Sequence, residues 1–260
     1  MMTTVGIVQA RTSSSRLPGK VLLPICGKPM ILYQLERLKR CKHIDQLVLA
    51  TSTDISDDTL ANQVKAEGYK VFRGDLEDVL ERFRACSAKE NASIVVRLTG
   101  DCPLSDPVLI DELIEAYLNG DWDYLGNCID EDKLTVPDGF DAEIFDARLL
   151  ERASREAMLP SEREHVTPWL RTSGAGLRWG HFRHRKTRPY YRVTVDDPVD
   201  LEVVRKIAEA MEATNTDFGV DEVVKYLEEN PRVACLNQST TRNEGFLKSL
   251  KKDSLMERGE

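Results

Sequence analysis

Strand-like and helix-like segments alternate along the first half of the chain, and this alternation restricts the fold more than any other feature. The predicted strands are residues 5–8, 46–51, 69–72 and 93–97, and the predicted helices are residues 57–67 and 76–89, with another helix starting at Pro29. Strands and helices that alternate at this spacing form βαβ units. We therefore expect a three-layer α/β fold, in which helices cover both faces of a mostly parallel sheet.

The length and composition fit an ordinary globular protein. A chain of 260 residues is sufficient for one α/β domain, and its 41% hydrophobic and 31% charged residues are typical values. The N-terminus lacks a signal-peptide pattern and no apolar run has the length of a transmembrane helix, so we expect a cytoplasmic protein without membrane contact. The net charge of -8 argues against nucleic-acid binding. Six scattered cysteines without a CxxC pair indicate reduced thiols and argue against a zinc site.

The loop after the first predicted strand combines positive charge with small side chains. Arg11, Arg16 and Lys20 surround three consecutive serines, and no acidic residue precedes Glu36. Ligands of parallel sheets bind beyond the carboxyl ends of the strands, where this loop would lie. Small side chains let backbone N–H groups approach phosphate oxygens, and Arg and Lys neutralise phosphate charge. A nucleoside triphosphate is therefore a candidate ligand, although a solvated Ser-rich turn has the same composition.

The order of residues in this loop resembles a known signature. Ala10, Arg11, Ser14, Arg16 and Lys20 stand as in the signature loop of the sugar nucleotidyltransferases, specifically the cytidylyltransferases that activate acidic sugars. The nearest branch resembles the spore-coat polysaccharide biosynthesis cytidylyltransferases. The resemblance implies a Rossmann-like sheet with a small β extension. It also implies that these residues bind the nucleotide and that the loop cations stabilise charge during catalysis.

Three further strand-end segments are candidates for the nucleotide site. Thr51-Ser52 ends the second predicted strand, and its hydroxyls would suit a pyrimidine edge or a plain turn. Gly74-Asp75 resembles the start of the family segment that closes over the base, whereas alone Asp75 is typical of a helix N-cap. By the same resemblance, Thr99-Gly100 belongs to the nucleotide site.

Two aspartates are candidate metal ligands. Asp101 follows a predicted strand in TGDCPLSDP, and Asp196 ends another predicted strand in VTVDDPVDLE. Each has a structural alternative, because helices are predicted to start near Asp106 and at Pro198, and an aspartate before a helix often caps it. Both segments resemble metal-binding segments of the family, which implies that Asp101 and Asp196 converge on Mg²⁺ (or Mn²⁺) beside the triphosphate.

Candidate acceptor residues lie on a predicted strand and its neighbour. Alternation within residues 137–145 places Asp141 and Glu143 on one face of a strand, where they would bind an acceptor or act as edge-strand charges. The segment PDGFDAE resembles the acceptor site of the family. If Asp101 binds the metal, Arg97 is expected on the sugar or phosphate side of the site.

The segment EREHVTP supplies two more acceptor candidates. Ser161 and Glu164 are interpreted as a capping box that starts a helix. That interpretation leaves Arg163 and His165 without a structural role. The resemblance implies that these two residues lie near the acceptor carboxylate or the subunit interface.

The predicted organisation is one nucleotidyltransferase domain, residues 1–231, followed by a charged extension with a frayed end, residues 232–260. Residues 120–190 are expected to serve acceptor binding or dimerisation. Within them lies the start of a basic, aromatic-rich stretch, residues 178–192. This stretch is short and has many acidic residues around it, which argues against a nucleic-acid site. We interpret it as an edge strand in a dimer interface or as a wall for an anionic substrate.

The resemblance implies a reaction in which CTP and an acidic sugar, or a related anionic acceptor, give a CMP conjugate and pyrophosphate in surface polysaccharide or glycan biosynthesis. A homodimer without a nucleic-acid partner is expected. Asp141, Glu143 and His165 remain open as the general base. Two alternatives are a glycosyltransferase that uses a nucleotide-sugar donor and a catalytically silent binding paralogue. The presence of both aspartates and all three loop cations disfavours the silent paralogue.

Overall fold

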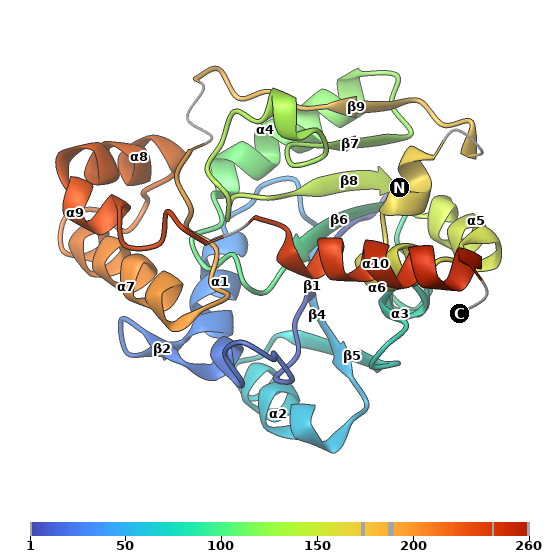
Figure 1. Cartoon of the computed structure of the whole chain (residues 1–260), viewed down its shortest axis with the longest axis horizontal. Helices are drawn as coiled ribbons and strands as arrows, with labels where there is room; N and C mark the ends of the chain where they lie inside the picture. Colours follow the sequence, from blue (N-terminus) through green and yellow to red (C-terminus); the bar gives the residue numbers. More distant parts are fainter. Residues whose placement is uncertain (1, 173–174, 187–189, 241, 259–260) are drawn as a thin grey trace.

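The described residues form a central seven-stranded mixed sheet with the strand order β5-β4-β1-β6-β8-β7-β9 (Figure 1). The computed structural model describes residues 2–172, 175–186, 190–240 and 242–258. The strands are β1 (Thr4–Gln9), β4 (Gln46–Ser52), β5 (Lys70–Gly74), β6 (Ile94–Thr99), β7 (Tyr124–Gly126), β8 (Glu143–Asp146) and β9 (Trp179–His181), and a separate ribbon pairs β2 (Pro24–Ile25) with β3 (Lys28–Pro29). The strands β5, β4, β1 and β6 are parallel, whereas β8 is antiparallel to both β6 and β7.

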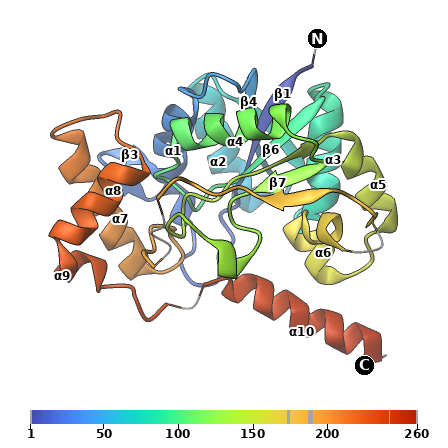
Figure 2. The same ribbon diagram turned by 90° about the horizontal axis from the view of Figure 1, so that it is seen from above.

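Helices cover both faces of this sheet (Figure 1, Figure 2). One core includes side chains of α1 (Met30–Leu38), α2 (Asp58–Ala66), α4 (Pro107–Asn119), α7 (Pro198–Glu212) and α8 (Val220–Glu229). The other includes α3 (Val79–Lys89) and α5 (Arg148–Glu156). The remaining helices are α6 (Pro160–His165), α9 (Pro231–Ala234), α10 (Glu244–Arg258) and four 3₁₀ turns within the described residues, at Lys20–Leu22, Ile55–Asp57, Glu131–Lys133 and Pro168–Arg171. The predicted three-layer α/β class is confirmed.

Side-chain alternation along β1 explains the two cores. Val5 and Ile7 are buried in one core, and Val8 is buried in the other. Successive side chains of a strand point to opposite faces, so an apolar strand of this kind needs cover on both sides. This requirement places β1 between β4 and β6, in the interior of the sheet.

The helices α3 and α6 start at residues other than those predicted, because other residues cap them. The helix α3 begins at Val79, where the Asp78 carboxylate accepts the N–H of Glu81 at 3.0 Å. Asp75 instead accepts the N–H groups of Glu77 and Asp78, each at 2.8 Å, in the preceding turn. An aspartate four residues before the first helical residue therefore shapes the turn and does not cap the helix.

The capping box predicted from Ser161 and Glu164 is wrong. The N-cap of α6 is Leu159, two residues earlier than predicted, and the Glu162 carboxylate accepts the N–H of Leu159 at 3.0 Å. The N–H of Ser161 donates to Asp253 of α10 at 2.9 Å. The residues expected as a charged extension with a frayed end thus include a helix that packs against α6. None of the helices in the described part of the chain has the length and apolar character needed to cross a membrane.

Residues 191–196 do not form the predicted strand. This segment makes an isolated bridge between Asp138 and Arg192 and does not join the sheet. Gly139 permits the close approach of the two segments, because it has a φ of 112° and a Cβ there would lie 2.4 Å from the Thr194 nitrogen. The edge strand expected within the basic stretch is present as β9, and residues 187–189 of that stretch lie outside the described residues.

Candidate active site

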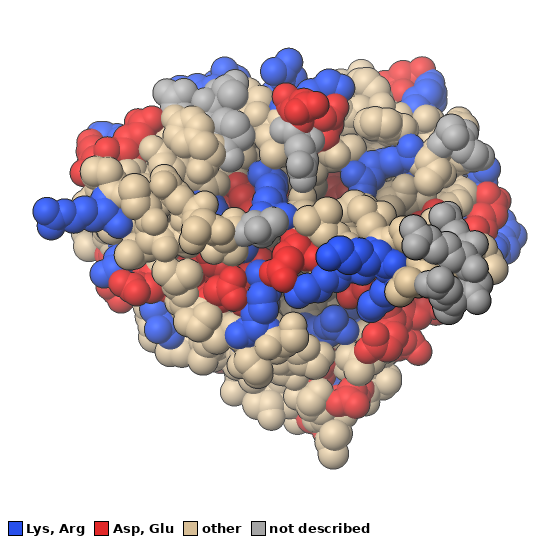
Figure 3. Space-filling model, viewed as in Figure 1, with Lys and Arg blue, Asp and Glu red and all other residues tan. Residues whose placement is uncertain are grey.

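A cavity of about 760 Å³ lies at the carboxyl ends of β1 and β6. A Cβ at Gly100 would lie 2.7 Å from the Ala10 Cβ, so glycine lets the two strand ends come together. Lys and Arg side chains gather around the hollow at the middle of this face, with acidic side chains between them (Figure 3). Most of the predicted site residues line the cavity: Ala10, Arg11, Ser14, Arg16, Lys20, Arg97, Thr99, Gly100, Asp101, Asp141, Glu143, His165 and Asp196.

The base of the cationic loop is anchored by Asp57. Its carboxylate accepts the N–H of Thr12 at 2.7 Å and the hydroxyl of Thr51 at 2.9 Å. The N–H of Ser52 binds the same carboxylate at 3.2 Å. Gly19, with a φ of 70°, donates its N–H to the Thr12 carbonyl at 2.8 Å and closes the loop. Thr51 and Ser52 are fully buried in this anchor and do not line the cavity, because their polar groups already bind Asp57.

The Lys20 ammonium group contacts both candidate metal ligands. Its Nζ donates to the Val195 carbonyl at 2.6 Å and lies 2.9 Å from Asp196 Oδ1 and 3.5 Å from Asp101 Oδ2. Burial opposes the positive charge, but the two carboxylates outweigh this effect and raise the pKa of the Lys20 ammonium. One side chain from the loop therefore contacts both aspartates.

Backbone hydrogen bonds, and not a parallel strand, bring the two aspartates together. The N–H of Val195 donates to the Asp101 carbonyl at 2.8 Å, and the Thr194 hydroxyl donates to the same carbonyl at 3.1 Å. Because Asp196 directly follows Val195, this hydrogen bond also holds Asp196 close to Asp101. The helix after Asp101 is capped by Asp106, whose carboxylate accepts two backbone N–H groups, so the Asp101 carboxylate is not used as a cap.

Arg16 is surrounded by carboxylates from the far end of the chain. Its guanidinium lies 3.0 Å from Asp196 Oδ1, 3.3 Å from Asp197 Oδ2 and 3.2 Å from Glu244 Oε2. Burial alone would raise the pKa of Asp196, but Lys20 and Arg16 outweigh burial and lower that pKa to about 2. The carboxylate of Asp196 is therefore ionised at neutral pH.

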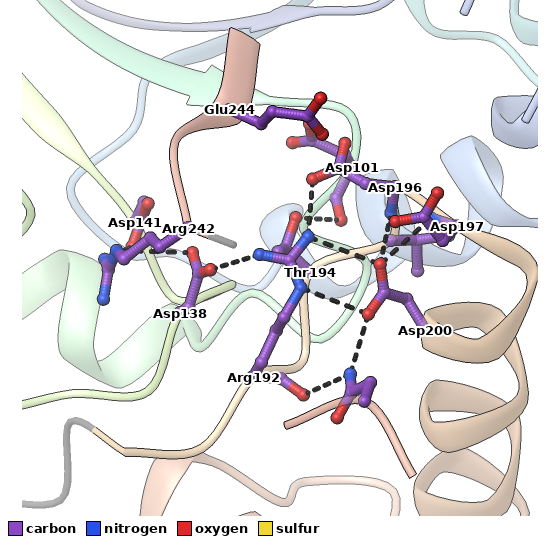
Figure 4. A network of polar contacts seen from close by, with 12 residues as sticks. Asp101, Asp138, Asp141, Arg192, Thr194, Asp196, Asp197, Asp200, Arg242 and Glu244 are labelled. Atoms are coloured by element: carbon purple, nitrogen blue, oxygen red, sulfur yellow. Dashed lines mark hydrogen bonds and ion pairs between the residues drawn. The ribbon is translucent and has the colours of Figure 1, made fainter. Parts of the chain in front are cut away.

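The Arg192 guanidinium lies among three aspartates of the same cluster (Figure 4). Its guanidinium lies 2.6 Å from Asp138 Oδ2, 2.6 Å from Asp196 Oδ2 and 3.1 Å from Asp200 Oδ1. Asp200 is fully buried and also accepts the backbone N–H of Asp196 at 3.0 Å. These contacts hold the segment around Asp196 in position through both its side chain and its backbone.

Arg11 is held more weakly than Arg16 and Lys20. Its guanidinium lies 3.9 Å from Glu77 Oε1 and 3.8 Å from Glu164 Oε1, and its side chain is 35% exposed. Contacts of this length between partly exposed groups contribute little stability. Arg11 can therefore reorient toward an anionic ligand at low cost.

The opposite wall of the cavity is built around Glu143. Arg97 forms an ion pair with this carboxylate, which also accepts the hydroxyls of Tyr124 and, at 2.7 Å, Thr167. Arg97 Nε in turn donates to the Gln9 side chain at 3.1 Å. Burial would raise the pKa of Glu143, but Arg97, Arg171 and the two hydroxyl hydrogen bonds together outweigh burial and lower it, so the buried pair stays charged.

Asp141 and His165 also face the cavity. Asp141 lies 3.4 Å from Arg242, and burial raises the pKa of Asp141 to about 7. Burial lowers the pKa of His165 to about 4, so its ring is neutral at physiological pH. The ring contacts the Ser249 hydroxyl at 3.1 Å and packs edge-on against Phe246 of α10, with centroids 5.2 Å apart.

Three further predicted residues lie outside the cavity. Gly74 ends β5, and the exposed Asp75 accepts the N–H of Asp78 at 2.8 Å. Arg163 pairs with Asp78 and donates to the Ser154 carbonyl at 2.8 Å. Arg163 thus ties α6 to α3 and α5 and is not brought together with His165, because residues two apart on a helix do not share a face.

Several cavity residues were not predicted. Asp138 and Thr194 lie within motifs already recognised in the sequence, so reading those motifs to their ends would have found them. Thr167 lies within the recognised EREHVTP segment, and Arg171 follows that segment with little pattern of its own. Arg82 lies inside an amphipathic helix, where an arginine is expected to face solvent, and no sequence pattern indicated its burial.

The donor set of Asp101 and Asp196 fits a magnesium ion that arrives with a nucleotide. Among the described residues, no group of three or more His, Cys, Asp or Glu side chains could hold a metal ion alone. Mg²⁺ is commonly held by one or two carboxylates together with substrate phosphates and water. Two carboxylates that contact one ammonium beside a cationic loop match that requirement.

Comparisons with known proteins agree with this geometry. A family model described as cytidylyltransferase matches residues 5–242. The chain is 34% identical over 237 residues to the spore coat polysaccharide biosynthesis protein SpsF of Bacillus subtilis, covering 88% of this chain and 95% of SpsF. Over 115 residues, or 44% of each chain, it is 36% identical to the 3-deoxy-manno-octulosonate cytidylyltransferase of Geobacter sulfurreducens.

A solved structure supports the same assignment over nearly the whole chain. The protein resembles a cytidylyltransferase from Leptospira borgpetersenii with a TM-score of 0.83 and 31% identity, covering 93% of this chain and 99% of that chain. The family expected from the signature loop is confirmed by the family model and by these relatives. The chain belongs to the cytidylyltransferase family.

Proposed function

We propose that the protein transfers CMP from CTP to an acidic sugar or a related anionic acceptor, releasing pyrophosphate, in the biosynthesis of a surface polysaccharide or glycan. The observation that carries this proposal is the convergence of Asp101, Asp196 and Lys20 beside the cationic loop. The names of the Bacillus and Geobacter relatives, which refer to polysaccharide biosynthesis and to a sugar acid, support the acceptor class.

The loop cations bind the triphosphate and stabilise the charge that shifts onto pyrophosphate. An acceptor hydroxyl attacks the α-phosphorus, a new P–O bond forms, and the bond to the pyrophosphate oxygen breaks in line with it. Arg11 is free to turn toward the phosphates, whereas Arg16 and Lys20 exchange carboxylate contacts for phosphate contacts. Catalysis of this kind depends on positioning and electrostatic stabilisation more than on covalent participation of the protein.

Asp101 and Asp196 would hold Mg²⁺ (or Mn²⁺). The bound ion would supply positive charge to the triphosphate oxygens and so complement the loop cations. Arg192 and Asp200 keep the Asp196 segment in place for this role. Removal of divalent ions by a chelator is therefore expected to abolish activity and their return to restore it.

Asp141 fits the general-base role better than the other two candidates. Glu143 already pairs with Arg97 and accepts two hydroxyl hydrogen bonds, so its oxygens are occupied. His165 is neutral but contacts the Ser249 hydroxyl. The pKa of Asp141 is raised to about 7, near the value at which a general base is most effective. We assign Arg97, Glu143 and His165 to shaping the acceptor subsite.

Two further proposals concern assembly and location. The edge strand β9 and the exposed rings of Trp122 and Trp179, each 40% exposed, fit a homodimer interface. The Trp122 ring packs over Gly180 and so covers part of this edge, because a Cβ at Gly180 would lie 2.7 Å from that ring. All six cysteines are free thiols, which fits the reducing cytoplasm.

The test is pyrophosphate release with each of the four nucleoside triphosphates and a panel of acidic sugars. We expect release with CTP and at least one sugar acid, dependent on Mg²⁺. A protein that consumes a UDP-sugar and never releases pyrophosphate from CTP would instead be a glycosyltransferase.

A further inference from the structure

The helix α10 closes one side of the cavity, although it lies beyond residues 5–242, which the family model matches. It packs against α6 on the face of the molecule that carries the hollow (Figure 1, Figure 3). Phe246 and Ser249 are among its residues that line the cavity, and Ser249 is only 1% exposed. A buried hydroxyl needs hydrogen-bond partners, so the contacts of Ser249 show which groups it holds.

The Ser249 hydroxyl connects two neighbouring side chains of α6. Its Oγ donates to Glu164 Oε2 at 2.7 Å and lies 3.1 Å from His165 Nε2. The Gly245 carbonyl, at 3.2 Å, is a further acceptor within α10. A hydroxyl has one hydrogen, whereas a carboxylate and a carbonyl can only accept. Because that hydrogen is directed to Glu164, the hydrogen between Ser249 and His165 must come from the ring.

This contact determines which tautomer of His165 is present. The ring is neutral at physiological pH, because burial lowers the pKa of His165 to about 4. A neutral imidazole carries hydrogen on one nitrogen only, and the hydrogen bond of one nitrogen sets the state of the other. With hydrogen on Nε2, the Nδ1 atom has a free lone pair and can only accept a hydrogen bond.

The Nδ1 atom of His165 is accessible and unused. It has no hydrogen-bond partner among the residues that the structure describes, yet it is not one of the fully buried unpaired atoms. It therefore keeps contact with solvent in the cavity that His165 lines. The edge-on packing against Phe246 holds the plane of the ring. The helix α10 thus fixes both the tautomer and the orientation of an acceptor nitrogen at the cavity wall.

We propose that Ser249 is a positioning residue for the acceptor substrate, because it holds the His165 ring so that Nδ1 accepts a hydrogen bond from one acceptor hydroxyl. This inference rests on the proposed function, in which Asp141 takes the proton of a different hydroxyl. A sugar acid carries several hydroxyl donors. Phosphate oxygens at neutral pH have little hydrogen to donate, so the Nδ1 lone pair favours the acceptor over the triphosphate at this wall.

Ser254 shows what a serine with only a local role looks like on the same helix. Its hydroxyl donates to the Leu250 carbonyl, four residues earlier, at 3.1 Å. The side chain is exposed and does not line the cavity. Replacing Ser254 by alanine makes the same chemical change on α10 without touching His165, so Ser254→Ala is the matched control for Ser249→Ala.

The test uses steady-state kinetics of the whole protein with CTP, Mg²⁺ and the sugar acid of the panel above that gives the fastest pyrophosphate release. In Ser249→Ala we expect the KM for the sugar acid to rise about five- to tenfold, while kcat and the calorimetric affinity for CTP stay within about twofold. Ser254→Ala should leave all three values unchanged. Since Ser249 acts through His165, His165→Phe should raise the same KM, and adding Ser249→Ala to it should raise KM no further.

Additive increases of KM in the double variant would overturn the inference, as would an equal increase in Ser254→Ala. The ring tautomer of the wild type decides the matter even if a variant does not fold. In nitrogen NMR spectra of histidine-labelled protein at neutral pH, His165 should carry its hydrogen on Nε2, and hydrogen on Nδ1 would also overturn the inference. A wild type with the expected tautomer that releases no pyrophosphate would contradict the proposed function and leave the placement of the His165 ring by Ser249 standing.

Discussion

The two walls of the cavity hold their charged groups in different ways. On the wall that we propose for the phosphates, called the phosphate wall, Arg16 and Asp101 have side chains that are 25% and 31% exposed, and Arg16 and Lys20 each contact more than one carboxylate. On the wall that we propose for the acceptor, called the acceptor wall, the side chains of Arg97 and Glu143 are 11% and 6% exposed and bind each other. Ion pairs on the first wall can open when a ligand arrives, whereas the second is fixed before any ligand binds.

This difference explains how one cavity can accept a triphosphate and still orient an acceptor. A carboxylate that pairs with Lys20 or Arg16 takes the place that a phosphate would occupy, so nucleotide binding replaces one set of anions by another. The buried pair on the acceptor wall cannot be exchanged in this way, because separating it would leave an uncompensated charge. The following changes test each wall in turn.

The largest effect is expected from the carboxylates of the phosphate wall. Replacing Asp196 by Asn keeps its shape but removes the charge that would hold the metal, and we expect kcat/KM to fall by about 10³-fold. Asp101→Asn should lose a similar factor. The adjacent Asp197→Asn is the matched control and should lose less than about tenfold, because Asp197 contacts Arg16 but not Lys20. Steady-state kinetics of pyrophosphate release gives these values, and equal losses at Asp196 and Asp197 would contradict the assignment.

Breaking the acceptor wall should affect stability first. In Glu143→Gln, Arg97 remains buried without its counter-charge, and we expect the free energy of unfolding to fall by about 3 kcal/mol. Denaturant unfolding measures this loss. The control is Glu115→Gln, which breaks an exposed pair with His43 and should cost less than about 0.5 kcal/mol. An effect of Glu143→Gln no larger than the control would show that the wall is not prearranged.

Asp141 gives the acceptor wall a pH dependence with a defined sign. Its pKa is raised in the folded protein to about 7, so the folded state holds a proton that the unfolded chain releases near its ordinary pKa. The protein should therefore lose stability as pH rises toward 7, and Asp141→Asn should remove this loss. At pH 8 we expect the variant to be more stable than the wild type by at least about 1 kcal/mol, with no such gain at pH 4. Unfolding curves that differ equally at both pH values would exclude this explanation.

The smallest effect is expected at the edge of the phosphate wall. Glu244 lies 3.2 Å from Arg16, so it would compete with a phosphate group for this cation. Glu244→Gln should bind CTP about two- to fivefold more tightly, as measured by titration calorimetry. Glu229→Gln, which loses only a contact of 3.9 Å with Lys225 far from Arg16, should leave the affinity unchanged. A weaker affinity in Glu244→Gln would mean that this carboxylate supports the site and does not compete.

Residues of the phosphate wall differ in how far the sequence predicts them. Local rules placed the cationic loop and Asp101 at strand ends, because each follows a buried strand in a chain with clear βαβ spacing, whereas the ligand role of Asp101 came from the family resemblance. The same rules predicted a strand up to Asp196, whereas the structure places this residue by hydrogen bonds to the Asp101 carbonyl. A contact between residues so far apart leaves no local pattern, although the motif around each was recognised.

The sequence also does not show which polar side chains are buried. Thr51 and Ser52 end a strand at the correct edge, but their polar groups bind Asp57 and so cannot face a ligand. Arg82 shows the reverse case, since a charged residue of an amphipathic helix lies in the wall of the cavity. Which polar group is already satisfied depends on tertiary packing, and this decides which candidates can bind.

In the proposed mechanism, Asp101 and Asp196 act together with Lys20 to position CTP for transfer of its α-phosphorus. The most direct test follows CTP labelled at the α-phosphorus, with Mg²⁺ and a sugar-acid acceptor, in the wild type and in the double variant Asp101→Asn, Asp196→Asn. We predict that the wild type moves the label into a CMP conjugate while the released pyrophosphate stays unlabelled, and that the folded double variant leaves the label in CTP. Transfer at the wild-type rate by the double variant would contradict this account.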